Sequence, residues 1–220
     1  MKTAVIVFPG SNCDHDAYYA IKHVIGQEAA FVWHKATDLG DADVVVLPGG
    51  FSYGDYLRSG AIARFSPAME AVARFAIAGG PVVGICNGFQ VLTEAGLLPG
   101  ALQKNSGLKF LCRPATVRVE TTDSSLTGSA SVGAELSIPI NHFEGNYTCD
   151  ERTLEQLRDE DRIVLRYVGN PNGSVDDIAG VCNEARNVVG LMPHPERACN
   201  ELLGSTDGSV LIRSLLEAAA

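Results

Sequence analysis

Hydrophobic residues in the first half of the chain alternate between unbroken runs and runs with helical spacing. The unbroken runs cover residues 3–8, 43–47 and 82–85, each of a length that suits one buried strand. Between them, apolar residues recur every three or four positions over 17–25 and 69–76, the spacing of amphipathic helices. Buried strands that alternate with helices are typical of a mostly parallel sheet with helices on both faces. The pattern therefore predicts an α/β fold.

The second half of the chain is richer in short strands. We expect strands over residues 116–120, 137–140, 163–168 and 178–182, with a turn at 170–174 where Asn, Pro and Gly cluster. A charged patch around 154–158 indicates a surface turn or a short helix, and a last helix is expected over 209–219. The chain has 220 residues and no repeats or linkers, so we expect a single domain over 1–220.

The most informative stretch is residues 84–90, which read Gly-Ile-Cys-Asn-Gly-Phe-Gln and centre on Cys86. An apolar run precedes it, and a helical pattern follows over 89–95, which Gly96 can end. A reactive residue on such a sharp strand-to-helix turn needs small neighbours two positions away, here Gly84 and Gly88. The start of the helix also favours a thiolate. Cys86 is therefore a candidate nucleophile, and the alternative is an inert buried cysteine.

A second motif, Met-Pro-His-Pro-Glu, occupies residues 192–196. A residue before proline favours extended geometry, so Pro193 and Pro195 predict an extended segment. Alternate side chains of an extended segment share a face, which would place the carboxylate of Glu196 beside the imidazole of His194. A thiol, a base and a group that orients the base form the usual arrangement for nucleophilic catalysis. The alternative is a structural histidine.

Two further regions are candidates for binding a substrate. The loop at 48–52 follows a predicted strand, and its Gly50 and Phe51 could supply backbone N–H groups that, with the N–H of Asn87, form an oxyanion hole. The alternative is an ordinary turn. Gln90 lies one helical turn after the nucleophile and could contact the substrate, or it could simply face solvent.

Cys13 is a rival nucleophile near the start of a helix. The carboxylates that flank it would raise the pKa of its thiol. A structural role, or a role in positioning a loop, is therefore favoured for this residue.

Composition excludes several other classes of function. The net charge of −9, without a basic cluster, argues against nucleic acid or an anionic membrane as a partner. The first apolar run is too short for a signal-peptide core or a membrane span, and the six cysteines include no C-x-x-C, so reduced thiols in the cytoplasm are expected. There is no P-loop motif. His142 and Glu144 have the H-x-E spacing of zinc deaminases, but no P-C-x-x-C follows, so no metal site is expected.

Taken together, the Gly-x-Cys-x-Gly-x-Gln and His-Pro-Glu motifs resemble those of class I glutamine amidotransferases. The stretches 8–14, 48–63, 138–147, 170–180 and 192–197 look most like the glutaminase subunits of phosphoribosylformylglycinamidine synthases, which serve purine biosynthesis. The resemblance implies a flavodoxin-like open sheet and a catalytic triad of Cys86, His194 and Glu196. It also implies release of ammonia from glutamine through a cysteine thioester.

The same resemblance implies that this chain carries no cofactor. A larger synthetase subunit is expected to receive the ammonia and to use ATP and magnesium, often with a third small subunit. Three alternatives stay open at this point: an amidotransferase subunit for another synthetase, a cysteine hydrolase or stress protein of the same superfamily, and a non-catalytic binding scaffold.

Overall fold

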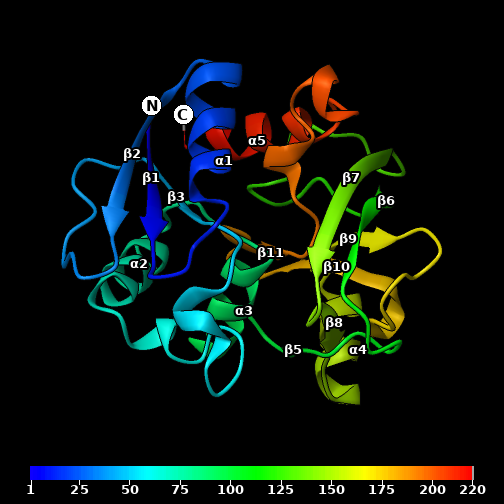
Figure 1. Ribbon diagram of the computed structural model, residues 1–220. Helices are drawn as coiled ribbons and strands as arrows, with labels where there is room; N and C mark the ends of the chain where they lie inside the picture. The colour runs from blue at the N-terminus through cyan, green and yellow to red at the C-terminus, as the bar shows by residue number, and fades with distance from the viewer. Residues whose placement is uncertain (220) are drawn as a thin grey trace.

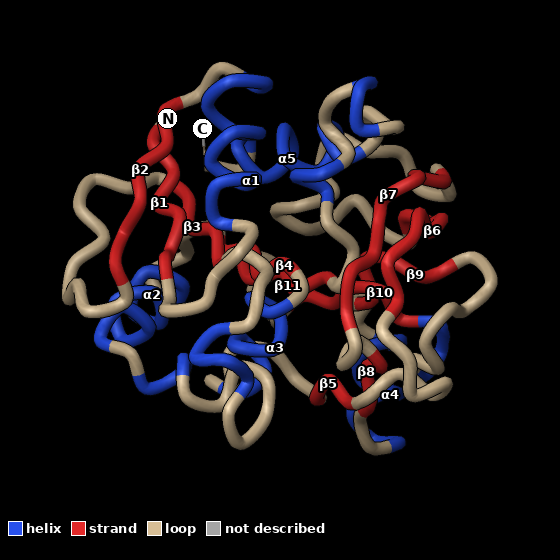
Figure 2. Tube along the Cα trace, in the orientation of Figure 1, coloured by secondary structure: helices blue, strands red, loops and turns tan. Residues whose placement is uncertain are grey.

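A nine-stranded sheet forms the centre of the computed structural model, which describes residues 1–219. The strand order is β2-β1-β3-β4-β11-β10-β9-β6-β7 (Figures 1 and 2). Its first five strands run parallel to one another: β2 (Glu28–Trp33), β1 (Lys2–Val7), β3 (Val44–Leu47), β4 (Val82–Ile85) and β11 (Val188–Leu191). β3, β4 and β11 are buried along their whole length, because helices cover both faces of this part of the sheet.

The other four strands extend the sheet in antiparallel fashion. They are β10 (Ile178–Cys182), β9 (Ile163–Tyr167), β6 (Leu111–Val119) and β7 (Glu135–His142). A separate two-stranded sheet pairs β5 (Ala101–Gln103) with β8 (Asn146–Thr148). β7 alternates between buried and more exposed positions, the pattern of a strand with only one face against the core.

Helices lie on both faces of the parallel half (Figure 2). One face carries α1 (Asp14–Tyr19), its π-helical continuation η1 (Ala20–Ile25), and α5 (Gly208–Glu217); the other carries α2 (Pro67–Ile77) and α3 (Asn87–Glu94). α4 (Glu151–Asp159) lies at the antiparallel end. The remaining helices are single 3₁₀ turns: η2 (Ser52–Asp55), η3 (Ala63–Phe65), η4 (Val175–Asp177), η5 (Pro195–Arg197) and η6 (Glu201–Leu203).

The predicted α/β architecture, a mostly parallel open sheet with helices on both faces, is confirmed. The edge strand β2 escaped the sequence pattern, since it is half exposed and begins Glu-Ala-Ala rather than with an apolar run. The helix expected over 17–25 exists, but half of it is π-helical, and it ends at Gly26 with φ +82°. Among residues 1–219, no helix has the length and apolar character needed to cross a bilayer.

The sheet topology brings the predicted motifs to one edge. Parallel strands end on the same side of a sheet, and ligands gather there in such folds. The register pairs Leu191 with Ile85, so the residues that follow β4 and β11 leave the sheet next to each other. The loop after β3 leaves beside them.

Candidate active site

Cys86 occupies a strained turn between β4 and α3. Its backbone has φ 51° and ψ −104°, a conformation that L-residues rarely adopt. A Cβ at Gly88 would overlap the carbonyl oxygen of Leu47, and one at Gly84 would lie 2.5 Å from Leu92 Cδ1. Both positions therefore require glycine, as the nucleophile-elbow interpretation predicts.

The imidazole of His194 is bonded to the carboxylate of Glu196. His194 Nδ1 lies 2.7 Å from Glu196 Oε1, and the two residues are 1% and 3% exposed. The contact matches the prediction, but the predicted extended conformation is wrong. Pro195 instead begins the 3₁₀ turn η5, because its fixed φ suits the first position of a helical turn. The turn carries Glu196 back under the ring.

Gly49 marks the point where the nucleophile and the base meet. A Cβ built on Gly49 would lie 2.7 Å from His194 Cε1, 3.4 Å from Cys86 Cβ and 3.2 Å from Cys13 Sγ. Burial opposes a charged imidazole, but the carboxylate of Glu196 and the two neighbouring thiols more than offset it. The pKa of His194 therefore lies well above its ordinary value.

Two backbone N–H groups beside Cys86 are free to act as an oxyanion hole. Within residues 1–219, neither the N–H of Gly50 nor that of Asn87 donates a hydrogen bond to another group. The N–H of Phe51, which we expected to contribute, is occupied. It donates to the carbonyl oxygen of Gly10 at 3.0 Å, because residues 10–12 pair with this loop around Ser11 and Gly50.

A cavity of about 230 Å³ opens next to Cys86. Gly50, Phe51 and Gln90 line it, as expected for substrate-binding residues. The amide of Gln90, however, is already bonded: Nε2 donates to the carbonyl oxygen of Glu144 at 2.5 Å, and Oε1 accepts from Asn87 Nδ2 at 2.8 Å. These two side chains shape the cavity wall rather than face solvent.

The cavity also contains polar residues that the sequence did not point to as ligand-binding: Asp55, Ser59, Asn141, His142 and Glu144. Ser59 Oγ donates to Glu144 Oε2 at 2.6 Å. The H-x-E spacing of His142 and Glu144 was the available signal, although on its own it pointed only to a zinc motif.

Burial shifts the pKa values of Asp55 and His142 in the cavity wall, upward for Asp55 and downward for His142. Burial and the charge of Glu144 together raise the pKa of Asp55 to about 6, although the nearby Ser59 hydroxyl acts in the opposite direction. Burial, followed by the charge of His194, lowers the pKa of His142 to about 4. His142 is therefore neutral at pH 7, whereas Asp55 and Glu144 make the cavity negative.

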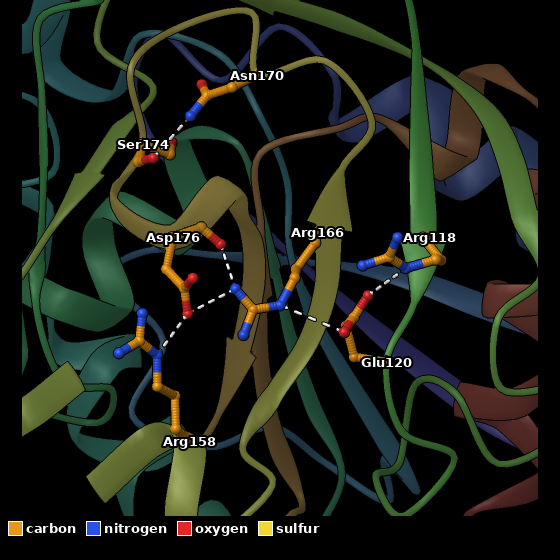
Figure 3. Close-up of polar contacts among 7 residues, drawn as sticks. All are labelled: Arg118, Glu120, Arg158, Arg166, Asn170, Ser174 and Asp176. Carbon is orange, nitrogen blue, oxygen red and sulfur yellow. Dashed lines mark hydrogen bonds and ion pairs between the residues drawn. The ribbon is translucent and has the colours of Figure 1, made fainter. Parts of the chain in front are cut away.

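The turn at 170–174 holds the loop that carries Glu144 through hydrogen bonds. Asn172 Nδ2 donates to the carbonyl oxygen of Gly145 at 2.7 Å, and Ser174 Oγ accepts from the N–H of Tyr147 at 3.0 Å. Asn170 Nδ2 in turn donates to the carbonyl oxygen of Ser174 at 2.8 Å (Figure 3). The turn at 170–174 is thus a support for the cavity wall.

A chain of charged residues holds that supporting turn in place (Figure 3). Arg166 Nη1 lies 2.6 Å from Asp176 Oδ2 and also donates to the carbonyl oxygen of Asp176, while its Nε lies 3.3 Å from Glu120. Arg158 extends the chain on the Asp176 side, at 2.8 Å, and Arg118 on the Glu120 side, at 2.7 Å. β6, β9, α4 and η4 are joined in this way.

A larger cavity of about 540 Å³ lies elsewhere, among Leu97, Arg162 and Asn183. Its lining, in the part of the chain that the structure describes, includes no cysteine, no histidine and none of the predicted site residues. Within residues 1–219, one group of side chains has metal-ligating composition with atoms within 4.8 Å of one another, namely Cys13, His194 and Glu196. In that group, Glu196 is already bonded to the imidazole.

A strained thiol, a buried base–carboxylate pair and free N–H donors beside a polar cavity are the parts of a thiol-dependent acyl-transfer site. The sequence model of CobB/CobQ-like glutamine amidotransferase domains matches residues 1–208. The chain belongs to this glutamine amidotransferase family.

Full-length relatives of this amidotransferase are named phosphoribosylformylglycinamidine synthase subunit PurQ. One from Koribacter versatilis is 56% identical over 229 residues, and one from Rubrobacter xylanophilus is 58% identical over 219 residues. In both cases the alignment covers 100% of this chain and 99% of the relative.

Solved structures agree with this assignment. The structure of PurLQS from Thermotoga maritima contains a chain 45% identical to this amidotransferase, with a TM-score of 0.92 and coverage of 100% and 99% of the two chains. A putative subunit of GMP synthase from Thermoplasma acidophilum matches with a TM-score of 0.67 at 17% identity, covering 100% of this chain and 94% of its own. The second match shows the shared fold alone.

Proposed function

We propose that this amidotransferase is the glutaminase subunit of a phosphoribosylformylglycinamidine synthase. In this role it hydrolyses glutamine to glutamate and ammonia for de novo purine biosynthesis. The observation that carries the proposal is the meeting of Cys86 with the buried His194–Glu196 pair at Gly49, beside the 230 Å³ cavity. The full-length similarity to relatives named as this subunit supports the choice of synthase.

The reaction begins with attack of the Cys86 thiolate on the side-chain carboxamide of glutamine. The raised pKa of His194 keeps a proton on the imidazole, beside the thiolate that it stabilises. The N–H groups of Gly50 and Asn87 would receive the oxyanion of the tetrahedral intermediate. His194 then gives its proton to the departing nitrogen, and ammonia leaves behind a glutamyl thioester on Cys86.

Hydrolysis of the thioester reverses these roles. The neutral imidazole takes a proton from water, and the resulting hydroxide attacks the thioester carbonyl. Collapse of the second intermediate breaks the carbon–sulfur bond, releases glutamate and returns Cys86 to its thiolate form. Glu196 holds Nδ1 throughout, so that Nε2 faces the reacting atoms.

The two carboxylates in the cavity suit the other end of the substrate. Glutamine carries an α-ammonium group, and Asp55 and Glu144 supply negative charge in a partly desolvated wall. We infer that they bind this ammonium group. The inference extends the predicted substrate contacts of Gly50, Phe51, Asn87 and Gln90, which line or shape the same cavity.

The relatives support the partner assignment. The Thermotoga maritima structure is of PurLQS, and we infer that this amidotransferase likewise joins two partners, a large synthetase subunit with a third small subunit. ATP and magnesium would act on the synthetase, with no cofactor, nucleic acid or membrane bound to this chain. All six cysteines are free, in keeping with a reducing cytoplasm.

The test uses the assembled complex with two nitrogen donors. Cys86→Ser should abolish glutamine-dependent product formation and leave activity with added ammonium salt intact, because free ammonia bypasses the thioester. Equal loss with both donors would show that Cys86 supports folding or docking instead. Replacing the synthetase by one of another pathway, such as a GMP synthetase, should give no glutamine-dependent product.

We also propose that the isolated chain is a weak glutaminase that its synthetase activates. The loop over 48–55 contains the three glycines 49, 50 and 54 and holds Tyr53 and Asp55 at positive φ, a strained backbone that could exist in a second form. Loss of one oxyanion donor typically costs about 10²–10³ in rate, enough to silence the free subunit. Equal turnover numbers for the isolated chain and for the complex with acceptor substrate and ATP would refute this activation.

A further inference from the structure

Cys13 is a buried thiol in the active site that the reaction described above does not use. It precedes α1, is 2% exposed, and donates its backbone N–H to the carbonyl oxygen of Gly49 at 3.3 Å. A Cβ built on Gly49 would contact Cys13 Sγ, Cys86 Cβ and the His194 ring together. Cys13 therefore reaches the catalytic imidazole from the β1–α1 loop.

The side chain of Arg197 holds the sulfur of Cys13 in place. Arg197 Nη2 donates to Cys13 Sγ at 3.1 Å, and Arg197 Nε donates to Asp16 Oδ2 at 2.9 Å. Polar atoms of Cys13, His194 and Glu196 all lie within 4.8 Å of one another. Arg197 is the last residue of η5, so its side chain connects the turn that follows His194 to the start of α1.

His194 has one fixed contact and one open one. Nδ1 is bonded to Glu196, whereas Nε2 is buried and has no hydrogen-bond partner among residues 1–219. A ring held only at Nδ1 can still pivot about that bond. In each tetrahedral intermediate the Cys86 sulfur is bonded to carbon and carries no negative charge while His194 is protonated, so the Nε2–H then needs another acceptor close by.

We propose that Cys13 is a positioning residue for this reaction: its sulfur, anchored by Arg197, is a second acceptor for the protonated Nε2 of His194. The inference rests on the proposed glutaminase function. Cys13 stays a thiol and forms no bond to substrate. It limits the pivot of the imidazole and accepts the Nε2–H hydrogen bond in the tetrahedral intermediates, in which Cys86 is bonded to the acyl carbon and His194 is protonated.

The surroundings of Cys13 are consistent with a sulfur that accepts hydrogen bonds and does not act as a nucleophile. Burial raises the pKa of the Cys13 thiol, although the neighbouring His194 and the charge of Arg197 act in the opposite direction. The carboxylates that flank Cys13 in sequence were expected to cause this rise, but burial is the main cause. Asp16 is instead paired with Arg197.

The test compares Cys13→Ser and Cys13→Ala in the assembled complex, with Cys182→Ala as the control for loss of a buried sulfur far from His194. Serine keeps an acceptor, whereas alanine removes it. Cys13→Ala should lower kcat about tenfold or more with KM for glutamine within about twofold, and Cys13→Ser should restore most of that loss. The alkaline limb of the kcat–pH profile, which reports the enzyme–substrate complex, should move to lower pH in Cys13→Ala, since an imidazolium without its acceptor loses its proton more readily.

Four further outcomes are decisive. Equal kcat for the serine and alanine variants, or a wild-type pH profile in Cys13→Ala, would overturn the proposal and leave Cys13 a packing residue. If Cys13→Ala does not fold, the same pH shift is expected in Arg197→Met, which releases the sulfur but keeps the thiol; an unshifted profile there would also overturn it. A wild-type complex without glutamine-dependent activity would instead refute the proposed function.

Discussion

Glu196 Oε1 lies 2.7 Å from His194 Nδ1 in a pocket from which water is almost entirely excluded. A carboxylate so placed fixes the imidazole tautomer and raises its pKa. Glu196→Gln should keep the fold and lower the glutaminase rate about 10- to 100-fold, less than the roughly 10²–10⁴-fold loss expected for His194→Ala. The alkaline limb of the profile of kcat/KM against pH should also move to lower pH in Glu196→Gln.

The measurement for Glu196→Gln is kcat/KM against pH in the assembled complex, with ammonia-dependent activity as the control for folding. A rate within about twofold of the wild type, roughly 0.4 kcal/mol, would mean that another acid orients the base.

Gly49 should tolerate no side chain. A methyl group there would lie 2.7 Å from His194 Cε1, and because Gly49 does not have a positive φ, the effect is purely steric. Gly49→Ala should displace the imidazole by several tenths of an ångström and lower kcat about tenfold or more. The matched control is Gly107→Ala, whose Cβ would meet nothing within 4 Å. If the two variants have equal glutaminase rates, the convergence of side chains at Gly49 is not functional.

Asp55 should give glutamine binding a pH dependence centred near 6. The pKa of Asp55 is about 6, so the carboxylate that we expect to bind the α-ammonium group forms as the pH rises through that value. KM for glutamine should therefore fall between about pH 5 and pH 7 in the wild type, and Asp55→Asn should have a higher KM at pH 7 that no longer changes. A variant that keeps the wild-type dependence would exclude Asp55 as the group that titrates.

The Asp55 carboxyl also makes the stability of the fold depend on pH. Ionisation of this group favours glutamine binding but lowers the free energy of unfolding. Its pKa in the folded protein is raised above 3.8, so its contribution to stability is fully present below that pH and is lost as the pH rises through about 6. Asp55→Asn should therefore gain thermal stability relative to the wild type at about pH 8 but not at about pH 4. The exposed Glu70→Gln serves as the control in the same melting experiments.

Arg166 should affect the affinity for glutamine although it does not line the cavity. It is the central member of the charged chain behind the cavity wall, and its side chain is 18% exposed. Arg166→Met leaves Asp176 and Glu120 without this partner, so we expect a loss of stability of about 1–3 kcal/mol and a higher KM, with little change in kcat. Arg118→Met, at the exposed end of the chain, should change stability by less than about 1 kcal/mol.

Thermal melts and glutamine saturation curves measure both effects of Arg166→Met. An unchanged KM in a clearly destabilised variant would show that the chain stabilises the antiparallel half of the sheet without shaping the cavity.

Much of the parallel half could be predicted because its strands are apolar along their whole length. The pattern over 43–47 and 82–85 corresponds to β3 and β4, and the turn at Cys86 follows from the spacing of its glycines. β2 was missed because an edge strand is only half buried. The geometry of residues 194–196 was wrong because Pro195 fits a helical turn as well as an extended segment.

The cavity wall was harder to predict, since it is built from loops whose positions depend on tertiary contacts. Asp55 and Glu144 lie far apart in sequence and meet because Ser59 bonds to Glu144 and the turn behind them holds the second loop. The occupied N–H of Phe51 likewise depends on a contact with residue 10. Sequence spacing carries no information about either pairing.

The position of β11 has a consequence for synthesis of the protein. β11 is the last strand of the described chain, yet it lies in the middle of the sheet, between β4 and β10. Within residues 1–219, the parallel and antiparallel halves of the sheet are hydrogen-bonded to each other through β11 alone. The pairing of β11 with β4 also brings His194 to Cys86. A nascent chain on the ribosome therefore carries its nucleophile long before its base, and it cannot consume glutamine until the residues up to Glu196 have emerged.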